Sequence, residues 1–112
     1  MKFSATIHDA TEKLKNETDQ RFTSLLKHGT MEVEYYAPDK VDHQTPHKQD
    51  ELYVIASGQS SFYRDGETIQ CKTGDVIFVP AGMEHRFLNF SNDFATWVIF
   101  YGACGGEKST GQ

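Results

Sequence analysis

Two histidines and one glutamate stand where they could bind a metal ion. His47 and Glu51 are four residues apart at the start of an apolar stretch, and His85 follows a Pro/Gly turn further along the chain. Imidazole nitrogens and a carboxylate on one side of a divalent ion leave coordination positions open for water or a substrate. The three residues therefore predict a metal centre capable of chemistry.

The segments around these residues predict how they meet. In an extended strand alternate side chains share a face, so the even spacing favours His47 and Glu51 on one side, although residues 48–50 are expected to turn. Pro80 and Gly82 are expected to reverse the chain, so that His85 enters on a neighbouring strand. Separate strands must converge to enclose an ion, because one extended strand cannot wrap around it.

Short β-branched and aromatic segments separated by Gly, Asp and Pro predict an all-β barrel or sandwich. The expected strands cover residues 21–28, 31–36, 51–56, 60–64, 67–71, 75–79, 84–89 and 94–101. Residues 21–28 fit either a helix or a strand, and a strand is favoured. Asp65 and Gly66 predict a tight hairpin. In residues 31–36, apolar and polar positions alternate, which predicts one buried face and one wet face.

Size and composition favour one domain over residues 1–112. Residues 1–20 are expected to be a peripheral segment with a short helix over 9–15, capped by Asp9 and Glu12, and residues 103–112 to be a flexible tail. The net charge of -5 argues against a nucleic-acid surface. No long apolar segment or secretory signal is evident, so we expect a cytoplasmic protein without a membrane span, with Cys71 and Cys104 as free thiols.

One stretch, GDVIFVPAGMEHRFLN, matches a known motif. The second motif of the cupin superfamily has Gly, Pro, Gly, His and Asn at fixed spacing, and its five places are filled here by Gly74, Pro80, Gly82, His85 and Asn89. The chain thus resembles the small single-domain cupins of the cupin-2 type. The resemblance implies a double-stranded β-helix, or jelly-roll barrel, with a short N-terminal helix added here.

The first cupin motif is matched only in part. His47, Glu51 and Gly58 fit its latter part, but Thr45 stands where the family places its first histidine. Asp39 also replaces an opening glycine. The resemblance thus implies His47, Glu51 and His85 as ligands of a divalent ion, with one position vacant.

Two residues could fill the vacant position. His43 would lie about 13 Å from His47 in an extended strand, so it would need a bulge to reach the ion. Gln44 is an equal alternative, and water or substrate is favoured over either.

The substrate-pocket candidates are Tyr53, Phe87 and Trp97. If Glu51 and His85 point inward, alternation turns Tyr53 and Phe87 inward with them. For the last strand, alternation alone does not decide whether the face that bears Trp97 or the opposite face lines the barrel. A cavity lined this way would suit a small, partly apolar or aromatic molecule.

The remaining polar candidates are given structural or surface roles. Asp50 is interpreted as an exposed neighbour of Glu51, and His8 and His28 as surface residues. Asn89 is expected to support the loop that follows His85.

These features favour a metal-dependent enzyme acting on a small organic molecule. Iron or manganese would permit dioxygenase-type chemistry, and zinc or nickel isomerase- or lyase-type chemistry, and the ligands do not choose among them. A second hypothesis is a non-catalytic metal- or metabolite-binding or sensing module. A third is a metal-free epimerase-like enzyme with His47 or His85 as base and Tyr53 or Tyr101 as acid. The resemblance also implies a homodimer.

Overall fold

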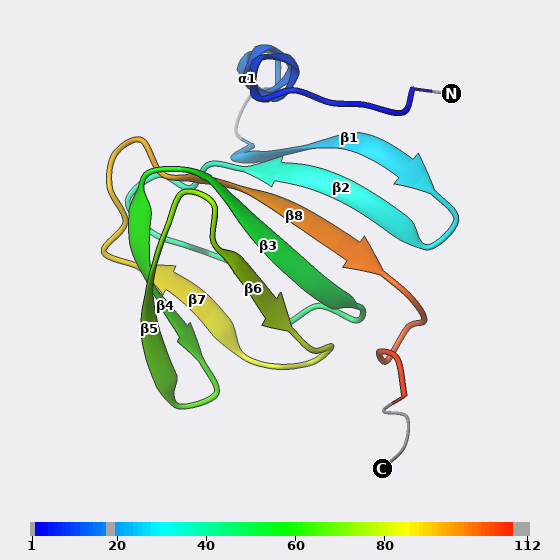
Figure 1. Ribbon diagram of the computed structural model, residues 1–112, viewed down its shortest axis with the longest axis vertical. Coiled ribbons are helices and arrows are strands. Elements are labelled where there is room, and N and C mark those ends of the chain that lie inside the picture. Colours follow the sequence, from blue (N-terminus) through cyan, green and yellow to red (C-terminus); the bar gives the residue numbers. More distant parts are fainter. Residues whose placement is uncertain (1, 18–19, 109–112) are drawn as a thin grey trace.

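Two antiparallel β-sheets form the barrel (Figure 1). The computed structural model describes residues 2–17 and 20–108. The larger sheet has the order β1 (Phe22–His28), β2 (Met31–Tyr36), β8 (Ala95–Tyr101), β3 (Asp50–Ser57), β6 (Val76–Val79). The smaller sheet has the order β5 (Glu67–Lys72), β4 (Gln59–Arg64), β7 (His85–Leu88). The all-β prediction and its expected strands are confirmed, with no bound shifted by more than one residue.

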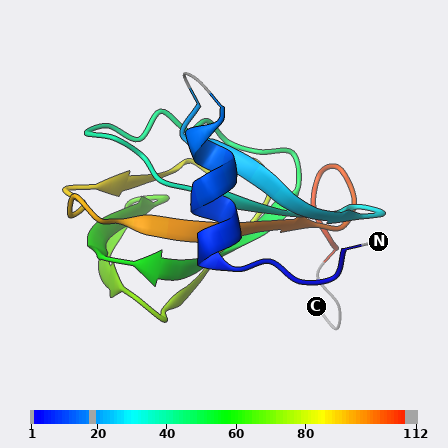
Figure 2. The same ribbon diagram turned by 90° about the horizontal axis from the view of Figure 1, so that it is seen from above.

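The helix α1 (Ile7–Lys15) begins two residues before the predicted start. Its N-cap is Thr6, whose side chain accepts from the Asp9 N–H while the Asp9 carboxylate accepts from the Thr6 N–H. The predicted capping pair of Asp9 and Glu12 is therefore wrong: Asp9 closes a capping box from inside the first turn. Ala10 is fully buried against the β1 side of the larger sheet, over which α1 lies in Figure 2.

The inner faces of the two sheets enclose an aromatic core. Glu51 of β3 is paired with Phe100 of β8 and with Val79 of β6, so these side chains turn inward at one level. Two residues along the strand, Tyr53 follows Glu51 on the same face and is fully buried. Because side chains alternate strictly along β3, Glu51 points into the barrel on the same face as Tyr53.

Strand β2 departs from the predicted division into a buried and a wet face. Tyr35 and Tyr36 point to opposite faces, yet they are only 3% and 8% exposed. Tyr36 belongs to the barrel core, and Tyr35 packs with Ala10 of α1 and Ala95 of β8. The helix α1 covers the second face of β2, and the sequence pattern of β2 alone gives no information about such a cover.

Left-handed residues build two of the turns between strands. Asp65 and Gly66, at φ 43° and 90°, form the predicted β4–β5 hairpin. Before β7, the Met83 N–H donates to the Pro80 carbonyl at 3.2 Å and Gly82 has φ 78°. The expectation that Pro80 and Gly82 reverse the chain before His85 is confirmed.

Part of the predicted flexible tail is hydrogen-bonded to the barrel. The Gly105 N–H donates to the Lys48 carbonyl, and the Glu107 N–H donates to the Asp50 carboxylate at 2.8 Å. Residues 109–112 of that predicted tail lie outside the described residues. Cys71 and Cys104 are free thiols, as expected. In the described ranges no helix is long and apolar enough to cross a membrane.

Substitution of Gly82 tests the turn before β7. A Cβ at this position would meet no atom within 4 Å, so the positive φ is the only obstacle to a side chain. We expect Gly82→Val to lower the free energy of unfolding by about 1–2 kcal/mol, measured by chemical denaturation. Gly82→Asn is the matched control, because asparagine tolerates this region, and it should cost less than valine. Equal losses in the two variants would contradict the assignment of the cost to φ.

Candidate metal centre

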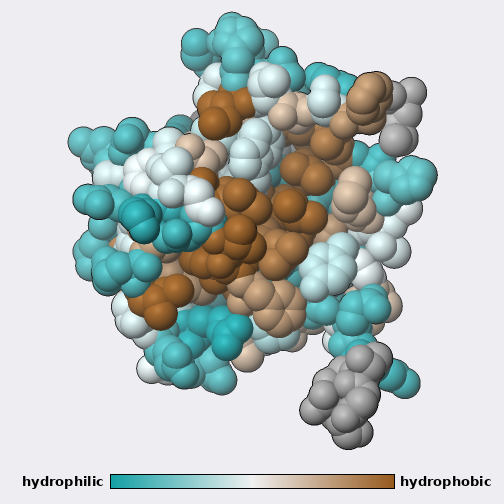
Figure 3. Space-filling model, viewed as in Figure 1, coloured by the Kyte–Doolittle hydropathy of each residue, from teal (hydrophilic) through white to brown (hydrophobic). Residues whose placement is uncertain are grey.

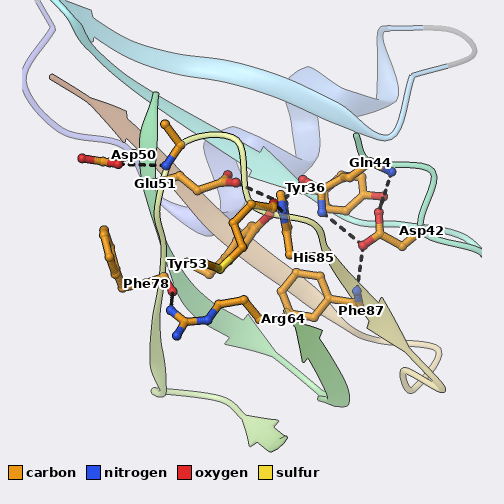
Figure 4. A network of polar contacts seen from close by, with 12 residues as sticks. Tyr36, Asp42, Gln44, Asp50, Glu51, Tyr53, Arg64, Phe78, His85 and Phe87 are labelled. Atoms are coloured by element: carbon orange, nitrogen blue, oxygen red, sulfur yellow. Dashed lines mark hydrogen bonds and ion pairs between the residues drawn. The ribbon is translucent and has the colours of Figure 1, made fainter. Parts of the chain in front are cut away.

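His47, Glu51 and His85 converge inside the barrel. One ligand atom from each lies within 4.8 Å of the others. Glu51 and His85 are 1% and 2% exposed, and His47 is half-buried. The Glu51 Oε1 atom lies 3.0 Å from His85 Nε2, and the imidazole rings of His47 and His85 are 5.9 Å apart between centroids. The three residues that sequence spacing selected are therefore neighbours (Figure 4 shows Glu51 and His85).

When the His85 ring is neutral, its unprotonated Nε2 atom faces Glu51. Its Nδ1 atom lies 2.9 Å from the Met83 carbonyl oxygen, which can only accept, so Nδ1 bears the proton. In a neutral ring the Nε2 lone pair then faces the Glu51 carboxylate, and two acceptors repel each other at 3.0 Å. A proton on Nε2 or a cation between the two groups would remove this repulsion.

Four ligand atoms of the cluster have no hydrogen-bond partner among the described residues. They are His47 Nε2, His85 Nε2 and both carboxylate oxygens of Glu51. Protonation of His85 would serve one carboxylate oxygen and leave His47 Nε2 and the other oxygen unpaired. A divalent ion bound by both imidazoles and the carboxylate accounts for all three side chains at once, so the residues fit a metal.

The pKa values of the two histidines are shifted in opposite directions. Burial lowers the pKa of His47, and the charge of Glu51 opposes this only in part. Burial also acts to lower the pKa of His85, but its contact with Glu51 and its bond to the Met83 carbonyl outweigh burial and raise it. His47 therefore favours the neutral, ligating form at neutral pH.

Backbone contacts place the two histidines together. The Gly82 N–H donates to the His47 carbonyl at 2.8 Å, so the turn that delivers His85 also holds the backbone of His47. The start of β7 is anchored across the smaller sheet, where His85 is paired with Arg64 of β4. The two sequence motifs are thus joined by a direct hydrogen bond.

A buried carboxylate that sequence reasoning missed supports the loop before β3. Asp42 is 4% exposed and accepts four hydrogen bonds. The donors are the Tyr36 hydroxyl, the Gln44 backbone and side-chain amides, and the Phe87 N–H. These bonds link β2, the loop and β7 (Figure 4), so Asp42 positions the chain between the two histidine-bearing segments. Its sequence setting, VDHQ, has no motif that could have identified it.

Asp50 was interpreted from sequence as an exposed neighbour, and this is wrong. It is 5% exposed, and its carboxylate accepts from the Ala81 N–H at 2.9 Å and from the Glu107 N–H at 2.8 Å. A carboxylate that accepts backbone N–H groups can be buried where a free one cannot. Asp50 thus fastens the Pro/Gly turn and the C-terminal segment to the start of β3.

A cavity of about 960 Å³ opens beside the cluster. Its walls come from β2, β8, residues 20–22 and the loop of residues 39–49, and His47 is the only one of the three cluster residues among them. His43 and Thr45 are exposed side chains of this wall, and His43 does not join the cluster. Gln44 is engaged by Asp42 and by the Tyr53 hydroxyl, at 3.1 and 2.9 Å. The side of the cluster facing the cavity is therefore the place for a further ligand from water or substrate.

The three predicted pocket residues have different places. Tyr53 and Phe87 are inward-facing, as predicted, but both are fully buried and form the floor below His85 rather than the cavity wall. Trp97 lies on the opposite face of β8, with its ring 5.1 Å from that of Tyr35 in the core beneath α1. The prediction for Trp97 is corrected, because the other parity set of β8 faces inward. Tyr36 and Phe100 line the cavity instead.

Glu34 of β2 lines this cavity together with the acidic residues Glu32 and Asp39, and sequence reasoning did not select it. It is half-buried and lines the wall. Burial, together with the negative charges of Glu32 and Glu51, raises the pKa of Glu34 to about 7. Such a carboxyl can gain or lose a proton at neutral pH. In the alternating pattern of β2, Glu34 falls among the polar positions that were expected to face solvent, so the sequence pattern offered no reason to select it.

A comparison with known families agrees with this geometry. The family described as the cupin domain matches residues 31–101, from β2 to the end of β8. The chain belongs to the cupin family. The predicted jelly-roll barrel is confirmed with it.

One sequence relative and two solved structures illustrate what this chain is similar to. An uncharacterized protein of Streptomyces coelicolor is 36% identical over 94 residues, which cover 82% of this chain and 90% of that protein. The crystal structure of a Cupin 2 conserved barrel domain protein from Salinispora arenicola is similar with a TM-score of 0.67 and 19% identity, over 92% of this chain and 90% of that chain. The crystal structure of the DMSP lyase DddQ from Ruegeria pomeroyi is similar with a TM-score of 0.63 and 20% identity, over 72% of this chain and 46% of that chain.

Replacement of Asp42 tests its role in this cupin. In Asp42→Asn one acceptor becomes an amide donor that faces existing donors, so we expect a loss of about 2–4 kcal/mol in the free energy of unfolding. Asp39→Asn is the matched control in the same loop, because Asp39 is exposed. Urea denaturation of both variants measures the difference. A loss for Asp42→Asn no larger than for Asp39→Asn would refute the role.

The pH dependence of stability tests the environment of Glu34. A pKa raised from 4.5 to about 7 means that the folded protein keeps a proton that the unfolded chain has lost, so stability falls as pH rises through this window. Glu34→Gln removes this fall. In metal-free protein we expect the variant to be more stable than the parent by about 1 kcal/mol near pH 8, a value discounted for partial exposure, and similar to it near pH 4.5.

Thermal melts at the two pH values measure this difference, and the histidines contribute equally to parent and variant. Glu67→Gln, at an exposed position on β5, makes the same charge change outside the cavity. The same gain at high pH in both variants would indicate a general effect of net charge and would contradict the assignment to Glu34.

Proposed function

We propose that this cupin binds one divalent metal ion through His47, Glu51 and His85 and acts as an enzyme on a small organic molecule in the adjacent cavity. The observation that carries the proposal is the set of four buried ligand atoms that converge without hydrogen-bond partners among the described residues. Buried polar atoms are rarely left unpaired in folded proteins, so this set is built to receive a cation.

When bound there, iron or manganese would supply dioxygen chemistry, and zinc or nickel would supply Lewis-acid chemistry of the isomerase or lyase type. Two imidazoles and one carboxylate are compatible with each of these ions. The DMSP lyase DddQ, which has the same fold, supports the lyase type as one member of this range.

The chain's own residues would divide the work at the cavity. His47 contacts both the cluster and the cavity, and its ring packs against Phe100 with centroids 4.8 Å apart, so its orientation is restrained. Tyr36 and Phe100 offer aromatic surface to a partly apolar substrate. Glu34 would hold or release a proton at its carboxylate near pH 7. This arrangement supports proton transfer to a substrate bound between β2 and the cluster.

A non-catalytic metal- or metabolite-sensing module is the alternative, and one observation favours it. Glu51 and His85 are almost fully buried, and of the three cluster residues only His47 reaches the cavity wall. An ion enclosed in this way could stabilise the barrel or report on metal supply without meeting a substrate. A measurement of catalytic turnover distinguishes the enzyme from the sensing module. The predicted cytoplasmic location would suit either function.

The metal-free epimerase hypothesis loses its proposed acids. Tyr101 has the parity of Trp97, so its side chain leaves β8 on the face opposite Phe100. Tyr53 is fully buried and donates its hydroxyl proton to Gln44 at 2.9 Å, and burial raises its pKa well above the ordinary value. Neither hydroxyl is offered to a substrate in the cavity.

Metal titration of single variants tests the ligand set. Metal-free protein is reconstituted separately with iron(II), manganese, zinc and nickel, and bound metal is measured by elemental analysis and calorimetry. We expect about one ion per chain, and at least ~100-fold weaker binding for His47→Ala, Glu51→Gln and His85→Ala. His43→Ala is the matched control, since this histidine lies in the same loop but outside the cluster. Parent-like affinity in His85→Ala would defeat the proposal.

Catalysis is tested separately on the metal-loaded parent. Oxygen uptake with iron-loaded protein, under a panel of aromatic and keto-acid substrates, measures the dioxygenase type. Product formation from small hydroxy-acid, sugar and β-eliminable substrates measures the isomerase and lyase types. Stoichiometric metal with no turnover in any assay would favour the sensing module over the enzyme.

A further inference from the structure

After β8 the chain folds back onto the end of the barrel. Residues 102–107, which we call the C-terminal clasp, lie beside the start of β3 and are drawn in orange-red in Figure 1. Gly105 and Gly106 have φ values of 93° and 91°, and the Gly106 N–H donates to the Ala103 carbonyl at 2.9 Å. The two glycines permit a tight turn that brings the backbone close to the barrel.

Hydrogen bonds, rather than apolar packing, hold the clasp. Its sequence is GACGGE, and its one long side chain, that of Glu107, accepts from the Ala103 N–H at 3.2 Å. Figure 3 shows mainly hydrophilic residues at this corner of the molecule, whereas the hydrophobic area lies across the middle, over β3, β6 and β8. The position of the clasp is therefore set by the groups to which it is hydrogen-bonded.

One set of these bonds fixes the segment that bears His47. The Gly105 N–H donates to the Lys48 carbonyl at 2.6 Å, one residue after this ligand candidate. The Gln49 side-chain amide donates to the Gly102 carbonyl at 2.9 Å. Residues 42–49 belong to neither sheet, so they lack the ladder of backbone hydrogen bonds that fixes a strand. The clasp supplies two bonds in its place, at residues 48 and 49.

A second set of bonds fixes the turn that delivers His85. The buried Asp50 carboxylate accepts from the Ala81 N–H of this turn and from the Glu107 N–H of the clasp. A Cβ at Gly106 would lie 2.8 Å from Oδ1 of Asp50 and 3.2 Å from Cβ of Ala81. The clasp therefore packs directly on both groups, with no space for a side chain between them.

We propose that the C-terminal clasp is a positioning element of the metal centre, which keeps His47 and His85 at the separation that an ion requires. This inference rests on the proposed function, because it takes these two residues as metal ligands. The clasp fixes Lys48 on one side and, through Asp50, the Pro/Gly turn on the other. Between them the Gly82 N–H donates to the His47 carbonyl, so the three segments form one hydrogen-bonded unit. Ligands held within about 0.5 Å of their bonding positions bind an ion more tightly than mobile ones.

Coupling between the clasp and the ion must act in both directions. If the clasp strengthens metal binding, the bound ion stabilises the clasp by the same factor. We expect bound zinc to slow hydrogen exchange of the Gly105 and Glu107 amides at least ~10-fold in the parent protein, measured by NMR. Exchange rates that bound zinc leaves unchanged at both amides would contradict the proposal.

Alanine at Gly106 tests the contact with Asp50 in the full-length chain. The added Cβ cannot fit against the carboxylate, so Gly106→Ala should displace the clasp and weaken zinc binding at least ~10-fold, measured by calorimetry. Gly105→Ala is the matched control, because its φ is nearly the same but its Cβ would meet no atom within 4 Å. It should bind zinc more tightly than Gly106→Ala. Equal affinities in the two variants would trace any loss to backbone strain and would overturn the proposal.

Two further comparisons separate the clasp from a general effect on stability and from the proposed function. Thermal melts of metal-free protein measure stability, and a Gly106→Ala variant that melts lower but binds zinc as tightly as the parent would overturn the positioning role. If the parent binds no metal, the proposed function fails by itself. The clasp is then judged in metal-free protein, where Gly106→Ala should speed exchange of the Gly82 amide at least ~10-fold relative to Gly105→Ala. Equal exchange in both variants would overturn the clasp as a positioning element.

Discussion

The contact between the Glu51 carboxylate and Nε2 of His85 governs this barrel. Both groups are almost fully buried, and when the His85 ring is neutral, with its proton on Nδ1 toward the Met83 carbonyl, both are acceptors. An unpaired carboxylate in a protein interior costs several kcal/mol unless a charge or hydrogen bonds compensate it. The surrounding strands keep this contact in place despite its cost, which is understandable if a cation belongs between the two groups.

Two other buried carboxylates maintain that arrangement by a different chemistry. Asp42 and Asp50 accept backbone N–H groups from segments far apart in sequence, Phe87 and Ala81 among them. Their negative charge is matched by donors at once, whereas that of Glu51 is not. Among the described residues, the three buried acids are therefore of two kinds: Asp42 and Asp50 fasten loops to strands, and Glu51 has no donor of its own.

The sequence was sufficient for whatever depends on local spacing. The Gly74 to Asn89 motif located His85, and strand patterns located nearly every strand, because turn residues and alternation are local properties. Asp42 and Asp50 were missed or misjudged because their donors come from other strands. Trp97 was misplaced because alternation separates two faces of β8 but does not say which one is inside. Asn89 takes φ 53° at the end of β7, a backbone role that its place in the motif did not specify.

One register controls both faces of the larger sheet. Glu51 and Tyr53 face inward because β3 pairs with β6 and β8 at the observed register, and Leu52 and Val54 face outward for the same reason. A slip of one residue in β3 would put Leu52 beside the two histidines and Glu51 on the outer face, so the arrangement of both faces would be lost together. The aromatic floor resists this slip, since the Tyr53 ring packs against Phe87 with centroids 4.9 Å apart in the core. Packing of the core aromatic residues thus secures the polar site on one side of the sheet and the apolar surface on the other.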